Sequence, residues 1–346
     1  MTKNRLFWGR VFAADFIYAK IMQIYAPTVN TKGANMTKVF IDGNQGTTGL
    51  KIYERFQGRS DIEILTIPDS LRKDTEARRE LINKSNITFL CLPDDAAREA
   101  VSLCENPDTV IIDASTAHRT ADGWAYGFPE LSAEHRRKIE VGKRIATPGC
   151  HAGGFLSLLY PLTSKGIVSP DYPLVCYSLT GYSGGGKKMI GEYEGADRDI
   201  LLDSPRQYGI TQNHKHLKEV KHVAGLTRTP IFAPIVADFP QGMEVSLPLY
   251  TDMMNGISSV KEAHDFFSDF YAGQNMVKVL PLDEYSSGFI ASNKYANDNR
   301  MYIFVGGNDE RILLCSVFDN LGKGASGAAV QCMNISLGID ETTGLI

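Results

Sequence analysis

The sequence lacks an excess of positive charge, a long apolar run and closely spaced cysteines. Its 346 residues carry a formal net charge of −4, which gives the chain no general affinity for nucleic acid. No window has the length and uniform apolarity of a membrane-spanning helix. The six cysteines form no CxxC pair and no dense framework, which argues against a zinc site and suits a reduced compartment. We therefore expect a cytoplasmic protein with no metal, membrane or nucleic-acid partner.

Residues 1–35 differ in composition from the rest of the chain. They hold five basic residues against the single Asp15, and Asp15 and Lys20 interrupt their apolar runs, which is a poor fit to a signal peptide. A first strand is predicted directly after Met36. We expect residues 1–35 to be an extension, disordered or upstream of the true start, ahead of a chain long enough for two domains.

The stretch 146–154 combines an interruption of regular structure with a cysteine. Pro148 and Gly149 break any regular element, and from Phe155 apolar residues recur at helical spacing. Cys150 therefore falls in a turn at the N-terminus of a predicted helix, where unpaired N–H groups and the helix dipole favour the reactive thiolate. Cys150 is a candidate nucleophile, and the alternative is a small buried cysteine.

A glycine-rich turn follows the predicted strand 39–41. Its three glycines are spaced G-x-x-G-x-x-G, which departs from the dinucleotide fingerprint G-x-G-x-x-G but has the same strand–turn–helix context. Such a turn leaves room for a pyrophosphate, and the helix start offers N–H donors. Glycines also simply make tight turns, which is the alternative. The residues assigned to the cofactor here are Gly43, Gly46, Thr47, Thr48 and Gly49.

The second predicted strand, 62–67, ends at the position where a dinucleotide-binding protein binds the adenosine ribose. An acidic residue there selects NAD through the 2′-hydroxyl, whereas Ser70, Arg72 and Lys73 suit the 2′-phosphate of NADP. NADP is therefore favoured, although Asp69 keeps NAD open.

Two further apolar runs, 87–92 and 109–113, are typical of strands buried on both faces of a parallel sheet. Ligands bind beyond the carboxyl ends of such strands, and Ala114 and Ser115 follow the second run. Arg119 comes soon after and presents a planar fork suited to phosphate. The alternative is a surface arginine in a loop.

The second half of the chain holds further candidates. The predicted strand 174–180 leads into a Ser–Gly-rich loop with Ser183 and Gly184, which suits an anion site or a mobile connector. His214 and His216 open a predicted helix and point in different directions, so one of them can act as general acid/base for Cys150. Two histidines that share a metal on a helix are four residues apart, so no metal site is predicted.

Strands dominate from residue 231, with one helix at about 259–271. This pattern predicts an α+β domain with a mostly antiparallel sheet, whose open face a second subunit would cover in a homodimer or homotetramer. The small residues of 320–329 let a final helix press against another backbone, and we expect that helix to return to the first domain.

The order of these motifs resembles that of N-acetyl-γ-glutamyl-phosphate reductase, most closely its short, type 2 form. The resemblance covers Met36 to the C-terminus, and its specific parts are the Cys150 turn and the stretch Asn320–Ala325. The motifs that carry it are Gly43–Gly49, Ala114–Ser115, Pro148–Cys150, His214–His216 and Asn320–Ala325.

The resemblance implies two domains. Residues 36–149 with 320–346 would form a Rossmann-type α/β domain that binds NADP, with Asn320 and Gly322 in the cofactor site. Residues 150–319 would form the α+β catalytic and dimerisation domain.

The resemblance also implies NADPH-dependent reductive dephosphorylation of N-acetyl-γ-glutamyl phosphate to N-acetylglutamate semialdehyde, in arginine biosynthesis. Cys150 would form a thioester, His216 would move the protons, and Arg119 would hold the phosphate. The long form of the family has arginine where this chain has Lys215, so His214 stays a second candidate for the acid/base.

Two other functions stay open. Aspartate-semialdehyde dehydrogenase shares the chemistry on a shorter substrate and shares the glycine turn. A catalytically silent NADP-binding regulatory protein would not need a reactive Cys150.

Overall fold

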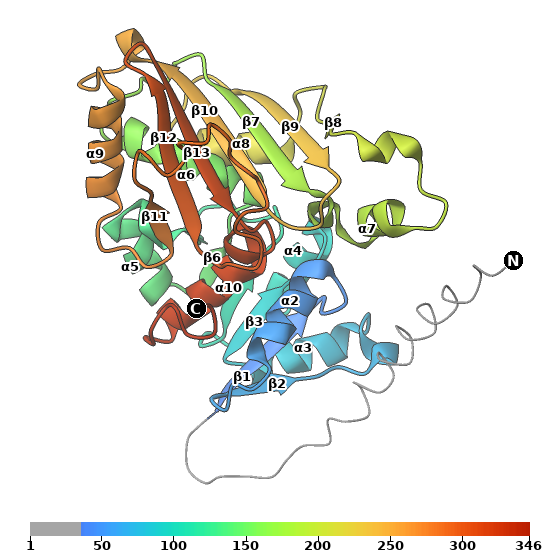
Figure 1. Cartoon of the computed structure of the whole chain (residues 1–346). Coiled ribbons are helices and arrows are strands. Elements are labelled where there is room, and N and C mark those ends of the chain that lie inside the picture. The colour runs from blue at the N-terminus through green and yellow to red at the C-terminus, as the bar shows by residue number, and fades with distance from the viewer. Residues whose placement is uncertain (1–35) are drawn as a thin grey trace, which may run out of the picture. The chain divides into compact units, whose positions relative to one another are not determined.

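The computed structural model describes residues 36–346, which form two sheets with their covering helices (Figure 1). The expectation for residues 1–35 lies outside the described residues. The first sheet has six strands in the order β2-β1-β3-β4-β6-β5, and every neighbouring pair is parallel. Its strands are β1 (Thr37–Asp42), β2 (Ile62–Leu65), β3 (Ile87–Leu90), β4 (Val110–Asp113), β5 (Ala125–Tyr126) and β6 (Arg144–Ala146).

The expected parallel sheet is confirmed, and the short strands β5 and β6 are additions to it. Strands of two and three residues are too short to show a period in the sequence. The register aligns the strand ends at one edge, because Asp42 pairs with Leu90, Leu90 with Asp113, and Asp113 with Ala146. The segments that follow these ends therefore meet at that edge.

Helices cover both faces of the first sheet. Alternate side chains of a strand point to opposite faces. In β1, Val39 and Ile41 pack in one apolar cluster with the final helix, whereas Phe40 packs in another with α3 and α4. The helices of this sheet are α2 (Thr47–Phe56), α3 (Thr75–Lys84), α4 (Asp94–Ser102), α5 (Ala133–Val141) and α10 (Gly327–Ser336). A fully buried phenylalanine such as Phe40 contributes roughly 1.5–3 kcal/mol relative to exposure.

Side-chain caps define the start of several helices. Asp74 accepts the Ala77 N–H at the start of α3, and Ser132 accepts the His135 N–H at the start of α5. Ser259 does the same for α9 (Val260–Phe270). Each such cap stabilises its helix by about 1 kcal/mol. The starts of α2 and α6 (Cys150–Ser164) have glycine caps and no side-chain cap, so their first N–H groups stay available.

The second sheet is mixed: four of its six neighbouring pairs are antiparallel and two are parallel, where a mostly antiparallel sheet was expected. Its order is β11-β12-β13-β10-β7-β9-β8, and the pairs β7–β9 and β11–β12 are parallel. A parallel pair needs a long crossover, and the excursion from residue 182 to 230 supplies it between β7 and β9. Apolar patterning does not reveal strand direction. The strands are β7 (Val175–Gly181), β8 (Arg206–Gln207), β9 (Ile231–Ala237), β10 (Met243–Tyr250), β11 (Val277–Val279), β12 (Met301–Asn308) and β13 (Arg311–Phe318).

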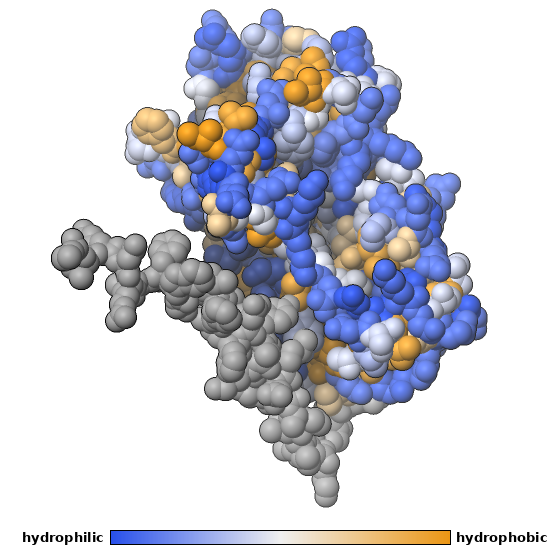
Figure 2. All heavy atoms as spheres, turned by 90° about the vertical axis from the view of Figure 1, so that its right-hand side faces the viewer, coloured by the Kyte–Doolittle hydropathy of each residue, from blue (hydrophilic) through white to orange (hydrophobic). Residues whose placement is uncertain are grey.

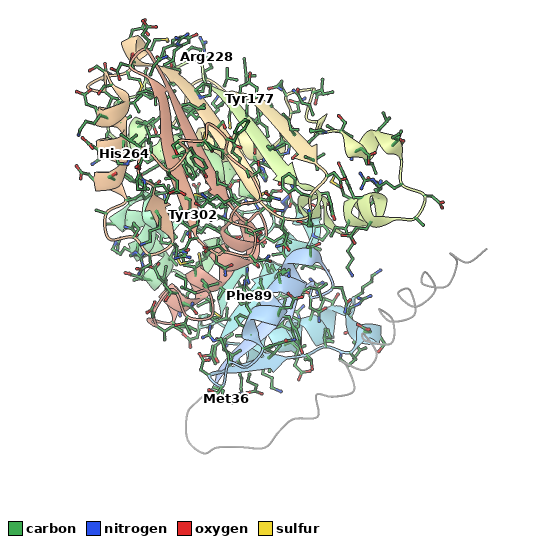
Figure 3. The ribbon with its side chains drawn as sticks, in the orientation of Figure 1. Met36, Phe89, Tyr177, Arg228, His264 and Tyr302 are labelled. Carbon is green, nitrogen blue, oxygen red and sulfur yellow. The ribbon has the colours of Figure 1, made fainter. Side chains whose placement is uncertain are left out.

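One face of the second sheet packs on helices. The other face is open at β7 and β10, but over β12 and β13 the segment that follows β11 covers it, where Tyr302 and Val317 are buried. Leu156 of α6, Val220 of α8 (Lys215–Val223) and Phe267 of α9 join the inner strand residues in one core. On the other face, Tyr177 of β7, which is labelled in Figure 3, is 51% exposed. Tyr250 of β10 is 58% exposed. This open face agrees with the expected need for a cover.

The Ser–Gly-rich segment after β7 is helical rather than a connector. A 3₁₀ turn, Tyr182–Gly185, runs into α7 (Gly186–Glu194). On the side of the molecule seen in Figure 2, hydrophilic residues prevail and hydrophobic side chains are scattered in small groups. Ile200 and Leu201, which follow α7, are exposed.

The final helix returns to the first sheet, as expected. Ala329, Val330 and Met333 of α10 share an apolar cluster with β1 and α2. Next to it, the buried ammonium of Lys323 donates to Glu130 Oε1 at 2.7 Å and to Gln331 Oε1 at 2.5 Å. The pair ties the segment after β13 to the turn before α5.

We predict that Lys323→Met destabilises the protein by about 3–5 kcal/mol, because the buried Glu130 carboxylate loses its cation. Urea unfolding measures the loss. Lys294→Met is the control, since Lys294 and Glu284 form an ion pair of which both side chains are more than one-third exposed. That control should cost less than about 1 kcal/mol. Equal losses for the two variants would contradict the prediction.

Candidate active site

Eight of the seventeen predicted site residues line one cavity of about 300 Å³. The cavity lies where the glycine-turn helix α2, the Cys150 turn, the start of α8 and the segment after β13 meet. A larger cavity, of about 780 Å³, lies among α5, α6 and α9 and contains none of the predicted site residues. The predicted residues that line the smaller cavity are Thr48, Ala114, Arg119, Cys150, Gly184, His214, His216 and Asn320.

Cys150 is the first residue of α6, as the sequence predicts. The strand β6 ends at Ala146, and Pro148 and Gly149 complete the turn into the helix. Burial raises the pKa of the Cys150 thiol, while the His151 N–H and the charges of Arg119 and Lys215 lower it less strongly. The helix start thus does not by itself give a thiolate, and a base has to accept the proton.

The two histidines have different roles in the fold. His214 is the N-cap of α8, where its Nδ1 accepts the backbone N–H of His216 at 3.4 Å. His216 is buried, and its Nε2 lies so close to Gly149 that a Cβ at that position would overlap it. Burial lowers the pKa of His214 and brings that of His216 well below its usual range. Both rings are therefore neutral at pH 7, and His216 is the one that reaches the turn of the nucleophile.

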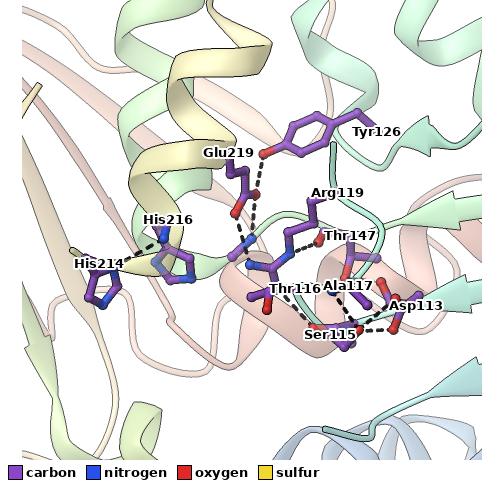
Figure 4. A network of polar contacts seen from close by, with 12 residues as sticks. Asp113, Ser115, Thr116, Ala117, Arg119, Tyr126, Thr147, His214, His216 and Glu219 are labelled. Carbon is purple, nitrogen blue, oxygen red and sulfur yellow. Dashed lines mark hydrogen bonds and ion pairs between the residues drawn. The ribbon is translucent and has the colours of Figure 1, made fainter. Parts of the chain in front are cut away.

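The carboxylate of Glu219 joins three segments at this turn (Figure 4). Its Oε1 accepts the Tyr126 hydroxyl at 2.7 Å and the Gly149 N–H at 2.9 Å. Its Oε2 accepts Nη1 of Arg119 at 3.0 Å. The sequence argument assigned no role to Glu219 or Tyr126. Glu219 lies three positions after His216, which puts both on one helix face, and this spacing was the one signal available for Glu219.

Arg119 is buried and held by backbone as well as by Glu219. Its Nε donates to the Thr147 carbonyl at 2.9 Å, and its Nη2 donates to the Ala114 carbonyl at 3.1 Å. A guanidinium has five N–H donors, so two remain for a ligand. Lys215, which also lines the cavity, has no ion-pair partner within residues 36–346.

Ser115 lies at the end of β4 but is turned away from the cavity. Its backbone N–H and its hydroxyl both donate to the buried carboxylate of Asp113, at 2.8 Å each. His118 Nδ1 lies 2.6 Å from the same carboxylate, and its ring stacks on Trp124 at 4.1 Å between centroids. These contacts shape the loop that carries Arg119. The sequence argument did not find this role for Asp113, His118 and Trp124.

The glycine turn has the backbone geometry of a nucleotide cradle. Gly43 has φ +90°, and a Cβ there would overlap the Cys91 carbonyl oxygen. A Cβ at Gly49 would overlap the Gly43 carbonyl oxygen, so the helix packs closely on the turn. Gly46 caps α2 without a side chain, and Thr47 and Thr48 begin the helix. The turn follows β1, whose neighbours in the sheet are β2 on one side and β3 on the other. The strand order reverses at this point, which is the ligand position in open α/β sheets. These residues fit a dinucleotide pyrophosphate.

The other predicted residues lie outside this cavity. Ser70 and Arg72 are exposed around a 3₁₀ turn after β2, Asp69–Leu71. Ser183 is buried, and its hydroxyl accepts Nδ2 of Asn320 at 3.0 Å. Gly322 is buried in a π-helical turn where a Cβ would lie 2.9 Å from the Asp298 carbonyl oxygen. Ser183 and Gly322 thus contribute to the packing behind the cavity.

His151 and Tyr208 are two cavity residues that the sequence argument missed. The His151 ring lies between the Ser178 hydroxyl at 2.6 Å and the Tyr208 hydroxyl at 2.7 Å. Burial lowers the pKa of His151 to about 3. The sequence offered one signal for His151, namely its position next to Cys150. It offered none for Tyr208, which lies 57 positions after His151.

Within residues 36–346, no group of three or more His, Cys, Asp or Glu side chains is arranged to hold a metal ion. In the same part of the chain, no helix has the length and apolarity to cross a membrane.

Comparison with known proteins agrees with this architecture. The family described as "Semialdehyde dehydrogenase, NAD binding domain" matches residues 35–139, and "Semialdehyde dehydrogenase, dimerisation domain" matches residues 150–320. The crystal structure of aspartate semialdehyde dehydrogenase II from Vibrio cholerae superimposes with a TM-score of 0.65 at 14% sequence identity, covering 88% of this chain and 99% of that one. At that identity the likeness shows the fold alone.

Sequence relatives are much closer. An N-acetyl-gamma-glutamyl-phosphate reductase from Chelativorans sp. is 47% identical over 305 residues, which cover 87% of this chain and 98% of the relative. N-acetyl-gamma-glutamyl-phosphate reductase 2 from Nostoc sp. is 44% identical and covers 90% of this chain and all of the relative. This chain therefore belongs to the N-acetyl-γ-glutamyl-phosphate reductase family of the semialdehyde dehydrogenases.

Proposed function

We propose that this protein reduces N-acetyl-γ-glutamyl phosphate to N-acetylglutamate semialdehyde and phosphate with NADPH, in arginine biosynthesis. The observation that carries the proposal is the single cavity that joins Cys150, His216 and the start of the nucleotide helix at Thr48. The names of the relatives, at 42–47% identity, support the reaction.

Cys150 and His216 would divide the covalent work. The neutral His216 ring accepts the thiol proton, and the Cys150 sulfur attacks the acyl carbonyl, so that a C–S bond forms and the bond to phosphate breaks. When bound at the glycine turn, NADPH would supply the hydride that reduces the thioester carbon. His216 then returns a proton as the C–S bond breaks, which releases the semialdehyde and the free thiol. Backbone N–H groups at the start of α6 can stabilise the oxyanion.

Positive charge at the cavity suits this substrate. Lys215 and the two remaining N–H donors of Arg119 would bind its phosphate and carboxylate groups. No Asp or Glu lines the cavity in the described part of the chain. An aspartyl substrate carries an ammonium that needs a carboxylate partner, whereas an N-acetylglutamyl substrate carries a neutral amide there. The lining thus favours the acetylated substrate. Gly184 also lines the cavity and would contact the substrate, with Ser183 behind it.

We infer that residues 36–149 with 320–346 bind the cofactor and that 150–319 form the catalytic and oligomerisation unit. Ser70 and Arg72, exposed after β2, would hold the 2′-phosphate of NADP. The open face of the second sheet, with Tyr177 and Tyr250, would pack on a second copy. The six free thiols suit the cytoplasm.

Cys150→Ser should keep the fold and NADP binding but lose turnover by about 10⁴-fold or more, because a serine alkoxide is far harder to form. In the parent protein, iodoacetamide labelling of Cys150 should rise steadily from about pH 7 to 9, since its thiol pKa is raised. Peptide mapping identifies the labelled residue. Cys104→Ser is the control: Cys104 is half-buried, lies outside the cavity, and should be dispensable. Full activity with Cys150 replaced would remove it from the mechanism.

His216→Asn should lower kcat by about 10²–10⁴-fold, because asparagine cannot carry the proton. His214→Asn is the matched control, since asparagine is also a good N-cap and keeps α8 in place. Steady-state kinetics of the two variants decide between the rings. An inactive His214→Asn beside a normal His216→Asn would reverse the roles.

The reverse reaction tests the substrate. With NADP and phosphate, N-acetylglutamate semialdehyde should give phosphate-dependent NADPH formation, and aspartate semialdehyde should give little. One methylene alone accounts for only about 1–3 kcal/mol, so the larger part of the discrimination should come from the unpaired ammonium. The opposite ranking would assign the chain aspartate-semialdehyde dehydrogenase activity, and NADP binding without turnover of either would support a silent regulatory protein.

A further inference from the structure

We propose that Glu219 is a positioning residue of this reaction, which fixes the turn of the nucleophile and balances the charge of Arg119. The inference rests on the proposed function in one respect, namely that Cys150 is the nucleophile. Glu219 itself does not line the cavity, so it acts through its partners.

The contacts of Glu219 come from three separate segments. Tyr126 belongs to β5, Arg119 to the loop after β4, and Gly149 to the turn before Cys150. All three donors approach a carboxylate that is 2% exposed (Figure 4). A buried carboxylate is costly unless it is paired and hydrogen bonded, so the three donors and Glu219 require one another.

The bond to Gly149 sets the distance between base and nucleophile. Glu219 and His216 are on the same face of α8, so the carboxylate and the imidazole move as one rigid unit. The Gly149 N–H that Glu219 accepts belongs to the residue directly before Cys150. A Cβ at position 149 would overlap both His216 Nε2 and Arg119 Nη1, so the turn at Gly149 packs tightly against both side chains.

The bond to Arg119 sets the charge at the cavity wall. Arg119 makes its only ion pair within residues 36–346 with Glu219. Arg119 favours the thiolate form of Cys150, and Glu219 opposes it more weakly, so Glu219 offsets part of the effect of Arg119. Removing the carboxylate would leave a buried cation beside the thiol, and the thiolate would then form at lower pH.

The test follows alkylation of Cys150 against pH, together with turnover. Glu219→Gln should shift the midpoint of iodoacetamide labelling to lower pH, because the charge of Arg119 is no longer offset. The same variant should lose kcat by about 10²-fold, because the turn is displaced from His216. Loosening of the turn would also expose the thiol and lower its pKa, because burial is the main cause of the raised pKa, so further variants have to separate charge from structure.

Two further variants separate charge from geometry. Glu219→Asp keeps the charge but is one methylene shorter, so the labelling midpoint should stay near the parent value while kcat falls. The double variant Arg119→Met with Glu219→Gln removes both charges, and its midpoint should return toward the parent value. If Glu219→Gln alone does not fold, Glu219→Asp still tests the positioning role and the double variant still tests the charge role.

Glu341→Gln is the matched control. Glu341 also accepts an arginine, Arg136 at 2.9 Å, but lies away from the cavity. In Glu341→Gln, the pH midpoint of Cys150 labelling should stay at the parent value.

An unchanged midpoint in Glu219→Gln, or an equal shift in Glu341→Gln, would overturn the charge role. Unchanged kcat in both Glu219→Asp and Glu219→Gln would overturn the positioning role. Labelling needs no substrate, so a parent protein that fails to reduce N-acetyl-γ-glutamyl phosphate would count against the proposed function and leave the labelling result interpretable.

Discussion

The buried carboxylate of Glu219 is the interaction on which the active-site geometry depends. It is the point at which the first sheet, the nucleophile turn and helix α8 are held together. A buried charge is stable only while its hydrogen-bond donors stay in position. Glu219 therefore holds the segments that carry these donors in one defined arrangement. The absence of a Cβ at Gly149 is the steric counterpart, because it lets Arg119 and His216 approach the same turn.

Register in the first sheet prepares this meeting. The aligned ends of β1, β3, β4 and β6 bring the glycine turn, the Arg119 loop and the Cys150 turn to one edge. Two helices, α2 and α6, begin at that edge with uncapped N–H groups. In the proposed reaction, the start of α2 would face the dinucleotide and the start of α6 would face the reacting carbonyl, within a single cavity.

The electrostatics of the cavity favour a resting enzyme without a preformed thiolate. Burial raises the pKa of Cys150 and lowers those of His151, His214 and His216, so the sulfur and the three rings are neutral. Positive charge remains at Lys215. In such a site the His216 ring is unprotonated and the Cys150 thiol is protonated. This fits proton transfer from the thiol to His216 as the substrate is attacked.

By itself, the sequence determined the parallel sheet, the glycine turn and the start of a helix at Cys150, because periodicity, glycine spacing and Pro–Gly breaks are local signals. Family resemblance added the reaction. Only the tertiary structure decided that the second sheet is mixed, that Ser115 faces Asp113, and that Glu219 binds Arg119 and the Gly149 N–H. Strand direction and the contacts of Glu219, which join residues 70 to 100 positions apart, are encoded by no local pattern, whereas the contact of Ser115 with Asp113 spans two positions and depends on side-chain orientation.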